Sequence, residues 1–131
     1  MKPIRCAAIL DTMWGNAGRA PRWFVINPSN HSGRRLYWLL DHESLLVTNA
    51  CKEQVGHSTI HGTPDPAWLA ENLQRVSYDL LLVCGRIAQM TFAICGYRPI
   101  CRILEMPHPA SRTWTRFRLD AYRAIIQTGI H

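Results

Sequence analysis

Short apolar runs alternate with amphipathic stretches along the chain. Four runs have the length and composition of β-strands, namely residues 22–27, 44–49, 78–84 and 100–106. The run at 78–84 is apolar almost throughout, which is typical of a strand covered on both faces. Four amphipathic stretches predict helices over residues 32–41, 65–77, 86–96 and 113–129.

Strand and helix therefore alternate four times, which favours a doubly wound α/β fold. We expect a mainly parallel, four-stranded sheet with helices on both faces. The 131 residues are expected to form a single domain. The first 21 residues are less regular: "CAAIL" (6–10) can add an edge strand, and "GNAGRAP" (15–21) reads as a loop.

Capping residues and side-chain spacing refine three of the helices. Asp65 is expected to cap the second helix, with Pro66 at its first position, and Gly96 to end the third. Spacing of three and four residues predicts which side chains point into the core. These are Ile87, Met90 and Ile94 on the third helix, and Trp114, Phe117, Ala121 and Ile125 on the last.

The charge of the chain comes mostly from arginine. The formal net charge is +6, and among 15 basic residues only Lys2 and Lys52 are lysines. Because arginine matches phosphate geometry and stacks on bases, this composition favours a nucleic-acid partner. A basic surface that only aids solubility is the alternative. A hydrophobic content of 47% with 18% charged residues indicates a packed globule and not a disordered chain.

Membrane and metal partners are not expected. No apolar run approaches the roughly 20 residues of a membrane-spanning helix, and residues 1–14 lack the features of a signal peptide, which favours a cytoplasmic location. The five cysteines contain no C-x-x-C pair and read as reduced, mostly buried thiols. His57 and His61 have a spacing seen in zinc sites, but no acidic residue lies between them and glycines flank them. We expect no cofactor.

Polar and turn-forming residues follow the predicted strands. In open α/β sheets, ligands bind beyond the carboxyl ends of the strands. The residues at those ends are Asn27-Pro28-Ser29, Asn49, Gly85 and Pro107-His108-Pro109. Two prolines restrict the backbone on both sides of His108 and exclude a helix there. We therefore expect Asn27, Asn49 and His108 to surround one pocket.

Three of these segments resemble signature motifs of the uracil-DNA glycosylase superfamily. "VINPS" (25–29) resembles the G-I-N-P-G motif after that family's first strand, and "LVTN" (46–49) resembles its I-T-N motif. "MPHPASR" (106–112) blends its H-P-S-P and M-P-S-S-S-A-R loops. The motifs keep the family's order, and the resemblance covers about residues 22–128. The chain is similar to a short, divergent member of the mismatch-specific uracil/thymine type.

The resemblance implies an enzyme that hydrolyses the N-glycosidic bond of uracil or a related pyrimidine in single-stranded DNA or a mismatched duplex. Asn27 then holds the attacking water, and His108 donates a hydrogen bond to the base as it departs as an anion. Asn49 reads the edge of the base through its amide. The remaining substrate-binding residues are Pro28, Ser29 and Ser111.

The resemblance also implies roles for three arginines and for Ser29. Ser29 stands where some members use a tyrosine that blocks the thymine methyl group, so selectivity should be loose. Arg112 stands where members push a side chain into the gap left by a flipped base. Arg116 and Arg123 extend a basic stripe along the last helix towards the phosphates, although solvated surface arginines are the alternative. We expect a monomer.

Two departures from the family keep other functions open. The chain shows no obvious catalytic carboxylate and no clear counterpart of the aromatic residue that stacks on the base, for which Tyr37, Trp38 and His31 are candidates. A catalytically weak nucleic-acid or nucleotide-binding module on the same fold is the alternative function. An enzyme for free nucleosides or modified bases is a third. Asn49 capping a turn and His108 in a structural loop are the corresponding structural interpretations.

Overall fold

The computed structural model describes residues 4–12, 18–19, 21–41, 44–54 and 62–130. Within them, the main sheet has four parallel strands in the order β3-β1-β5-β6. The strands are β1 (Ile4–Leu10), β3 (Leu45–Asn49), β5 (Tyr78–Cys84) and β6 (Arg102–Met106). The helices are α1 (His31–Leu39), α2 (Pro66–Leu73), α3 (Arg86–Ile94) and α4 (Arg116–Ile130). A separate antiparallel pair joins β2 (Gly18–Arg19) and β4 (Glu53–Gln54).

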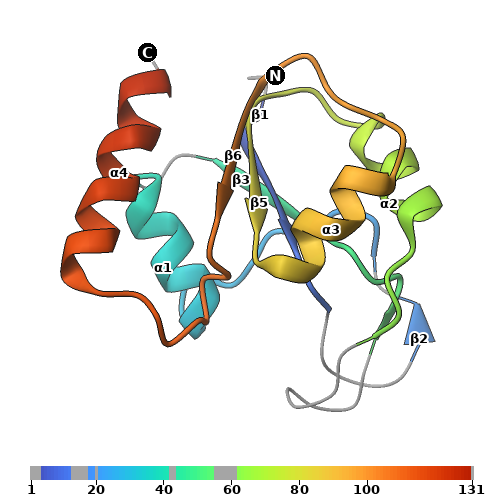
Figure 1. The fold of residues 1–131 in the computed structure, drawn as a ribbon, viewed down its shortest axis with the longest axis horizontal. Helices are drawn as coiled ribbons and strands as arrows, with labels where there is room; N and C mark the ends of the chain where they lie inside the picture. Colours follow the sequence, from blue (N-terminus) through green and yellow to red (C-terminus); the bar gives the residue numbers. More distant parts are fainter. Residues whose placement is uncertain (1–3, 13–17, 20, 42–43, 55–61, 131) are drawn as a thin grey trace.

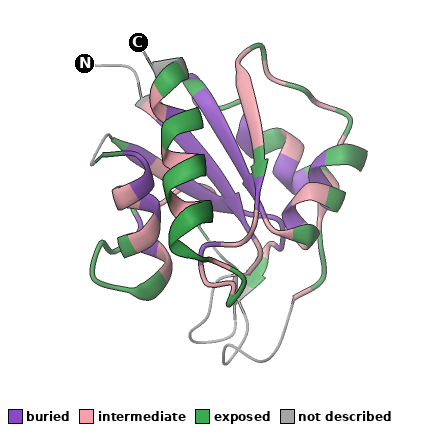
Figure 2. Cartoon of the chain, turned by 60° about the vertical axis from the view of Figure 1, so that its left-hand side comes forward, coloured by how far each residue is buried: buried purple, intermediate pink, exposed green. Residues whose placement is uncertain are grey.

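Helices cover both faces of the sheet. α1 and α4 lie on one face, and α2 and α3 on the other (Figure 1). Successive residues of a strand point to opposite faces, so Cys6 and Ala8 pack under α1 and α4, and Ala7 and Ile9 under α2 and α3. Figure 2 shows the buried strands between helices whose outward surfaces are exposed. The predicted doubly wound, parallel α/β fold is confirmed.

One predicted strand is wrong. Residues 22–27 do not enter the parallel sheet, and β1 takes that place between β3 and β5. "CAAIL" therefore belongs to an interior strand and not to an edge. The four residues from Cys6 to Ile9 have no exposed surface, because a strand with neighbours on both sides and helices on both faces is fully enclosed.

Residues 22–27 lie instead at the outer edge of β3. Phe24 and Val47 exchange two backbone hydrogen bonds of 2.9 Å, which form a single antiparallel bridge. Pro21 and Pro28 have no N–H to donate on either side of this segment. The segment covers part of an open strand edge without extending the parallel sheet.

The predicted inward faces of two helices are confirmed only in part: Ile87 and Trp114 pack against the core as expected, but the other predicted residues do not. On α3, Ala88 and Phe92 are buried in the core, whereas Met90 and Ile94 are 57% and 72% exposed. On α4, the described residues that pack on the core are Leu119, Tyr122 and Ile126, while Phe117, Ala121 and Ile125 are exposed. Both helices carry two neighbouring apolar stripes, and spacing alone does not choose between them.

The predicted end signals of α2 and α3 are confirmed. Asp65 caps α2, and its carboxylate accepts a 3.0 Å hydrogen bond from the backbone N–H of Trp68. Gly96 follows the C-cap of α3 with a φ of 82°, the left-handed conformation that favours glycine.

The described residues show neither a membrane-spanning helix nor a metal cluster. None of the helices there is long and apolar enough to cross a membrane. No group of three histidine, cysteine or acidic side chains among these residues has an arrangement that could hold a metal ion. His57 and His61 lie outside the described residues.

Candidate functional site

A pocket of about 910 Å³ lies at the carboxyl ends of the strands. Its lining comes from the ends of β1, β3 and β5, the loop after β6, and the segment before α1. From β1 the chain passes through α1 to β3, and from β5 it passes through α3 to β6, on the opposite face and in the opposite direction. The pocket therefore lies where two neighbouring strands lead away from each other, the usual ligand position in doubly wound sheets.

Five of the predicted site residues line this pocket: Asn27, Asn49, His108, Ser111 and Arg112. They come from three segments that are far apart in the sequence and that the parallel sheet brings together. Pro28 and Ser29 are exposed and belong to the same loop as Asn27, but they are not among the described lining residues. Arg116 and Arg123 lie on α4, away from the pocket lining.

Hydrogen bonds hold the His108 loop from several sides. The Nδ1 atom of His108 accepts a 3.0 Å bond from the backbone N–H of Ala110. In the neutral imidazole the proton therefore resides on Nε2, which becomes a donor. The backbone carbonyl of His108 accepts bonds from Trp114 Nε1 and the Ser111 N–H, both at 2.9 Å. These bonds fix both the ring and the tautomer.

α1 supports the same loop through Arg35. The guanidinium of Arg35 donates to the backbone carbonyls of Pro109 and Ser111, and its Cζ lies 5.8 Å from the centroid of the Trp114 ring. An arginine on α1 thus contributes to the position of the His108 loop.

Gly85 allows this loop to approach the start of α3. Its φ is 88°, and a Cβ atom at this position would lie 3.0 Å from the Cβ of His108. Its N–H donates to the Met106 carbonyl at 2.8 Å, and Gln89 Nε2 donates to the same carbonyl at 3.0 Å. β5, α3 and the end of β6 are therefore joined directly behind His108.

Asn49 presents a different arrangement at the end of β3. Its side chain is only 1% exposed, and its amide nitrogen Nδ2 has no hydrogen-bond partner. A buried donor without a partner costs about 1–3 kcal/mol. Because Asn49 also lines the pocket, a carbonyl group of a bound ligand is the natural acceptor for this amide.

The Asn27 loop lies against the first turn of α1. Asn27 Oδ1 accepts a 2.8 Å bond from the Ser29 N–H, and Asn30 caps α1 by accepting a 2.7 Å bond from the Gly33 N–H. A Cβ atom on Gly33 would lie 2.0 Å from the Asn27 carbonyl oxygen. Only glycine at that position allows the loop to approach the helix so closely.

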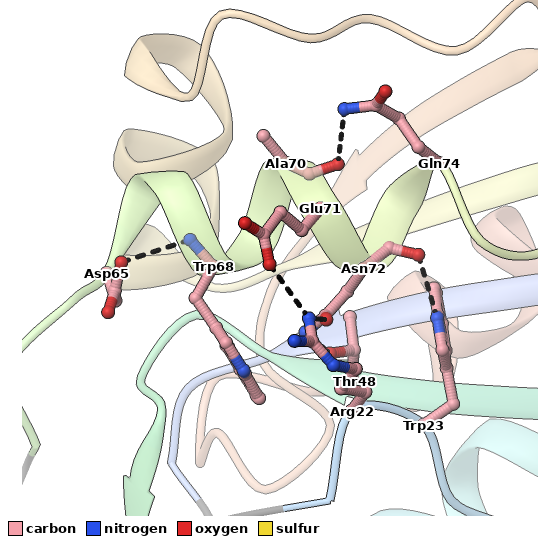
Figure 3. A network of polar contacts seen from close by, with 9 residues as sticks. All are labelled: Arg22, Trp23, Thr48, Asp65, Trp68, Ala70, Glu71, Asn72 and Gln74. Carbon is pink, nitrogen blue, oxygen red and sulfur yellow. Dashed lines mark hydrogen bonds and ion pairs between the residues drawn. The ribbon is translucent and has the colours of Figure 1, made fainter.

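A polar network fixes the segment that leads into this loop (Figure 3). Asn72 of α2 is buried; its Nδ2 donates to Thr48 Oγ1 at 3.2 Å, and its Oδ1 accepts from Arg22 Nη1 at 2.9 Å. The backbone carbonyl of Asn72 accepts from Trp23 Nε1 at 2.8 Å, and Arg22 pairs with Glu71 at 3.1 Å. One buried amide thus connects α2, β3 and the segment before the pocket.

Asp11 and Phe24 are lining residues with functional side chains that the sequence analysis did not single out. Asp11 follows β1 directly and brings a carboxylate to the pocket, where its Oδ1 accepts bonds from Thr12 Oγ1 at 2.8 Å and Cys51 Sγ at 3.7 Å. Phe24 is a partly buried aromatic side chain in the lining. Of the three predicted candidates for the base-stacking residue, His31 lines the pocket, whereas Tyr37 and Trp38 are not among the described lining residues. The polar residue after "CAAIL" was the available signal for Asp11, had that run been recognised as an interior strand.

The electrostatic setting of the pocket is mixed. The first residues of α1 and α3 line it, and helix N-termini favour negative charge. Arg86 and Arg112 are exposed cations in the lining, and Asp11 is an acidic group there. Burial raises the pKa of the Cys84 thiol in the lining, and raises that of the neighbouring Cys51 to about 11. Both thiols are protonated near neutral pH and neither is a ready nucleophile.

Arg116 and Arg123 of α4 are already engaged. Arg116 pairs with Asp120 at 3.2 Å, and Arg123 pairs with Asp41 at 3.0 Å. Both guanidinium groups also lie over the Trp38 ring, with Cζ-to-centroid distances of 5.5 and 4.4 Å.

No protein-family model matches this chain, and no curated protein is similar enough to it to show a family. The geometry of the pocket therefore carries the functional argument.

Proposed function

We propose that the protein is a DNA glycosylase that hydrolyses the N-glycosidic bond of uracil or a related pyrimidine. The observation that carries this proposal is the buried Asn49 amide, which lacks a partner in a pocket that His108 and Asn27 also line. A pyrimidine carbonyl is an acceptor for that amide, and a pocket of about 910 Å³ has room for a nucleotide.

His108 is the proposed electrophilic group. When the glycosidic bond breaks, its electron pair remains on the base, and negative charge develops on the base carbonyls. A donor from Nε2, oriented by the Ala110 bond at Nδ1, stabilises this charge. The loop bonds hold the ring in place before the reaction, so little reorganisation is needed at that moment.

Asp11 and Asn27 are proposed to hold the attacking water. The water oxygen bonds to the sugar carbon that loses the base, and the Asp11 carboxylate accepts the proton that the water releases. The same negative charge stabilises the positive charge that develops on the sugar. Phe24 is the aromatic side chain that can stack on the base.

One observation favours the alternative of a catalytically weak binding module. The Oδ1 atoms of Asp11 and Asn27 already accept hydrogen bonds from protein groups, Thr12 and Cys51 for the first and Ser29 for the second. The oxygen atoms of Asp11 and Asn27 have further lone pairs that can accept hydrogen bonds from a water. Catalysis needs both residues to bind the water in this way, whereas a binding module does not.

Base release decides between the two functions. Oligonucleotides that carry uracil, G·U or G·T mismatches, or modified pyrimidines are incubated with the protein and then cleaved at abasic sites with alkali. Strand scission at the pyrimidine supports the glycosylase. Binding of the same oligonucleotides without scission supports the binding module.

A further inference from the structure

A second hollow, of about 380 Å³, lies between α1 and α4. Its lining consists of His31, Arg34, Arg35, Trp38, Arg116 and Leu119. We refer to it as the α1–α4 groove. Three of its six lining residues are arginines and none is acidic, so the groove attracts anions.

The Trp38 ring lies beneath one of the arginines of the groove. Arg116 lies over the Trp38 ring. In such a contact most of the five N–H donors of an arginine stay available for hydrogen bonds. Arg34 is exposed and lies next to Arg35, which is bound to the His108 loop. A guanidinium that already rests over an aromatic ring is partly ordered, so it loses less conformational entropy when it binds a phosphate.

The groove adjoins the pocket. His31, the first residue of α1, lines both of them. A chain that places one nucleotide in the pocket can therefore continue past His31 along α1 and α4, with its phosphates beside Arg34 and Arg116.

We propose that the α1–α4 groove binds the phosphate backbone of a single DNA strand beside the nucleotide that enters the pocket. This inference rests on the proposed function and defines its substrate as a polynucleotide, not a free nucleoside. The ion pair between Arg116 and Asp120 competes with the phosphate. Both partners are well exposed, and exposed pairs contribute only about 0–1 kcal/mol, so a phosphate can replace Asp120.

Binding across a range of salt concentrations tests the groove. The variant is the double substitution Arg34→Ala/Arg116→Ala, and the matched control is Arg75→Ala/Arg98→Ala, which removes two exposed arginines on the other side of the sheet. The probe is a fluorescent single-stranded oligonucleotide with one internal deoxyuridine. We expect the groove variant to bind at least about tenfold more weakly, with a salt slope smaller by roughly 1.4 for two lost phosphate contacts. The control should resemble the wild type.

A gain of affinity provides the complementary test. Asp120→Asn removes the competing carboxylate from Arg116 and should strengthen binding about two- to fivefold at low salt. If both the groove variant and Asp120→Asn bind like the wild type, or if the control loses as much affinity as the groove variant, the groove is not a DNA site. A groove variant that loses affinity for RNA but not for DNA also overturns the proposal.

Different results would contradict the groove proposal and the glycosylase proposal. In single-turnover assays the groove variant should need at least about tenfold more DNA to reach half of its maximal rate. If the wild type releases no base but the groove variant still loses affinity and salt dependence, the glycosylase proposal is wrong and the groove remains a DNA site. If base release occurs and its DNA dependence is the same in all variants, the groove proposal is wrong and the glycosylase remains.

Discussion

The His108 loop and the end of β3 both line one pocket, but they differ in whether their polar groups have hydrogen-bond partners within the protein. In the loop, the His108 ring and carbonyl accept three hydrogen bonds from Ala110, Ser111 and Trp114. At the end of β3, Asn49 is almost fully buried and its amide nitrogen has no partner. The hydrogen-bond acceptors of His108 are thus satisfied within the protein, whereas the amide nitrogen of Asn49 is not.

This difference indicates two kinds of role: the His108 loop orients a donor, and the Asn49 amide is the proposed group for recognising a ligand. Bonds within the His108 loop stabilise the protein whether or not a ligand is present, and they hold a donor in one direction. The unpartnered Asn49 amide reduces the stability of the free protein and becomes favourable only when a ligand supplies an acceptor. A buried group that costs stability in the free state is common at binding sites, where stability and function oppose each other.

Replacing His108 should have the largest effect. His108→Ala removes a donor that acts mainly in the transition state, and the loss of one such donor lowers the rate about 10²–10³-fold, or roughly 3–4 kcal/mol. Single-turnover base release at saturating DNA measures this. DNA affinity should change little. A rate within about threefold of the wild type means that His108 only shapes the loop.

Gly85→Ala should disturb the His108 loop through the backbone. A backbone at φ 88° and ψ 167° is essentially restricted to glycine and costs another residue about 1–3 kcal/mol, and the new Cβ would lie 3.0 Å from the His108 Cβ. Gly96→Ala is the matched control, since Gly96 has a φ of 82° and a Cβ added there would meet no atom within 4 Å. Denaturant unfolding should show both losses of stability. Only Gly85→Ala should also lower the rate of base release, and equal rates for the two variants contradict this contact.

Asn49 should show stability and recognition moving in opposite directions. Asn49→Leu removes the unpartnered donor and keeps the same number of side-chain heavy atoms, so the free energy of unfolding should stay equal or rise by about 1 kcal/mol while pyrimidine recognition is lost. Asn72→Leu is the control, because its amide is equally buried but bonded to Thr48 and Arg22, and this variant should be destabilised. Asn49→Asp places a charge there and should impair both folding and recognition. An Asn49→Leu protein that is clearly less stable contradicts the distinction between the two regions.

The sequence predicted the parts of the site that follow recognised strands. β3, β5 and β6 are apolar runs of ordinary strand length, so Asn49, Gly85 and the His108 loop could be placed at one edge of the sheet. β1 was predicted only as an edge strand, because "IRCAAIL" contains two alanines, which are depleted in strands, and its burial between two strands is a tertiary effect.

The wrong strand explains the errors at the site. "RWFVIN" has a stronger strand preference than β1, but it forms only one bridge to β3. Asn27 lines the pocket from a loop before α1 and not from a strand end, and Asp11 was missed because its strand was expected only at an edge of the sheet. The faces of α3 and α4 depend on how closely each helix approaches the sheet, which side-chain spacing does not encode.

The end of β3 should also differ from the His108 loop in its response to alkaline pH, and this is the smallest expected effect. Burial is the main cause that raises the pKa of the Cys51 thiol from 9.0 to about 11; a hydrogen bond with Thr12 opposes this rise, and the negative charge of Asp11 contributes to it. The unfolded chain therefore loses the Cys51 proton at lower pH than the folded protein does. The stability linked to this proton is complete below pH 9 and is lost as the pH rises towards 11.

Between about pH 8 and about pH 9.5 the free energy of unfolding of the wild type should fall by up to about 1 kcal/mol more than that of Cys51→Ala, as measured by urea unfolding at each pH. His108→Ala is the control and should keep the alkaline slope of the wild type, because it leaves Cys51 and Asp11 in place. Parallel curves for the wild type and Cys51→Ala contradict the role of this thiol.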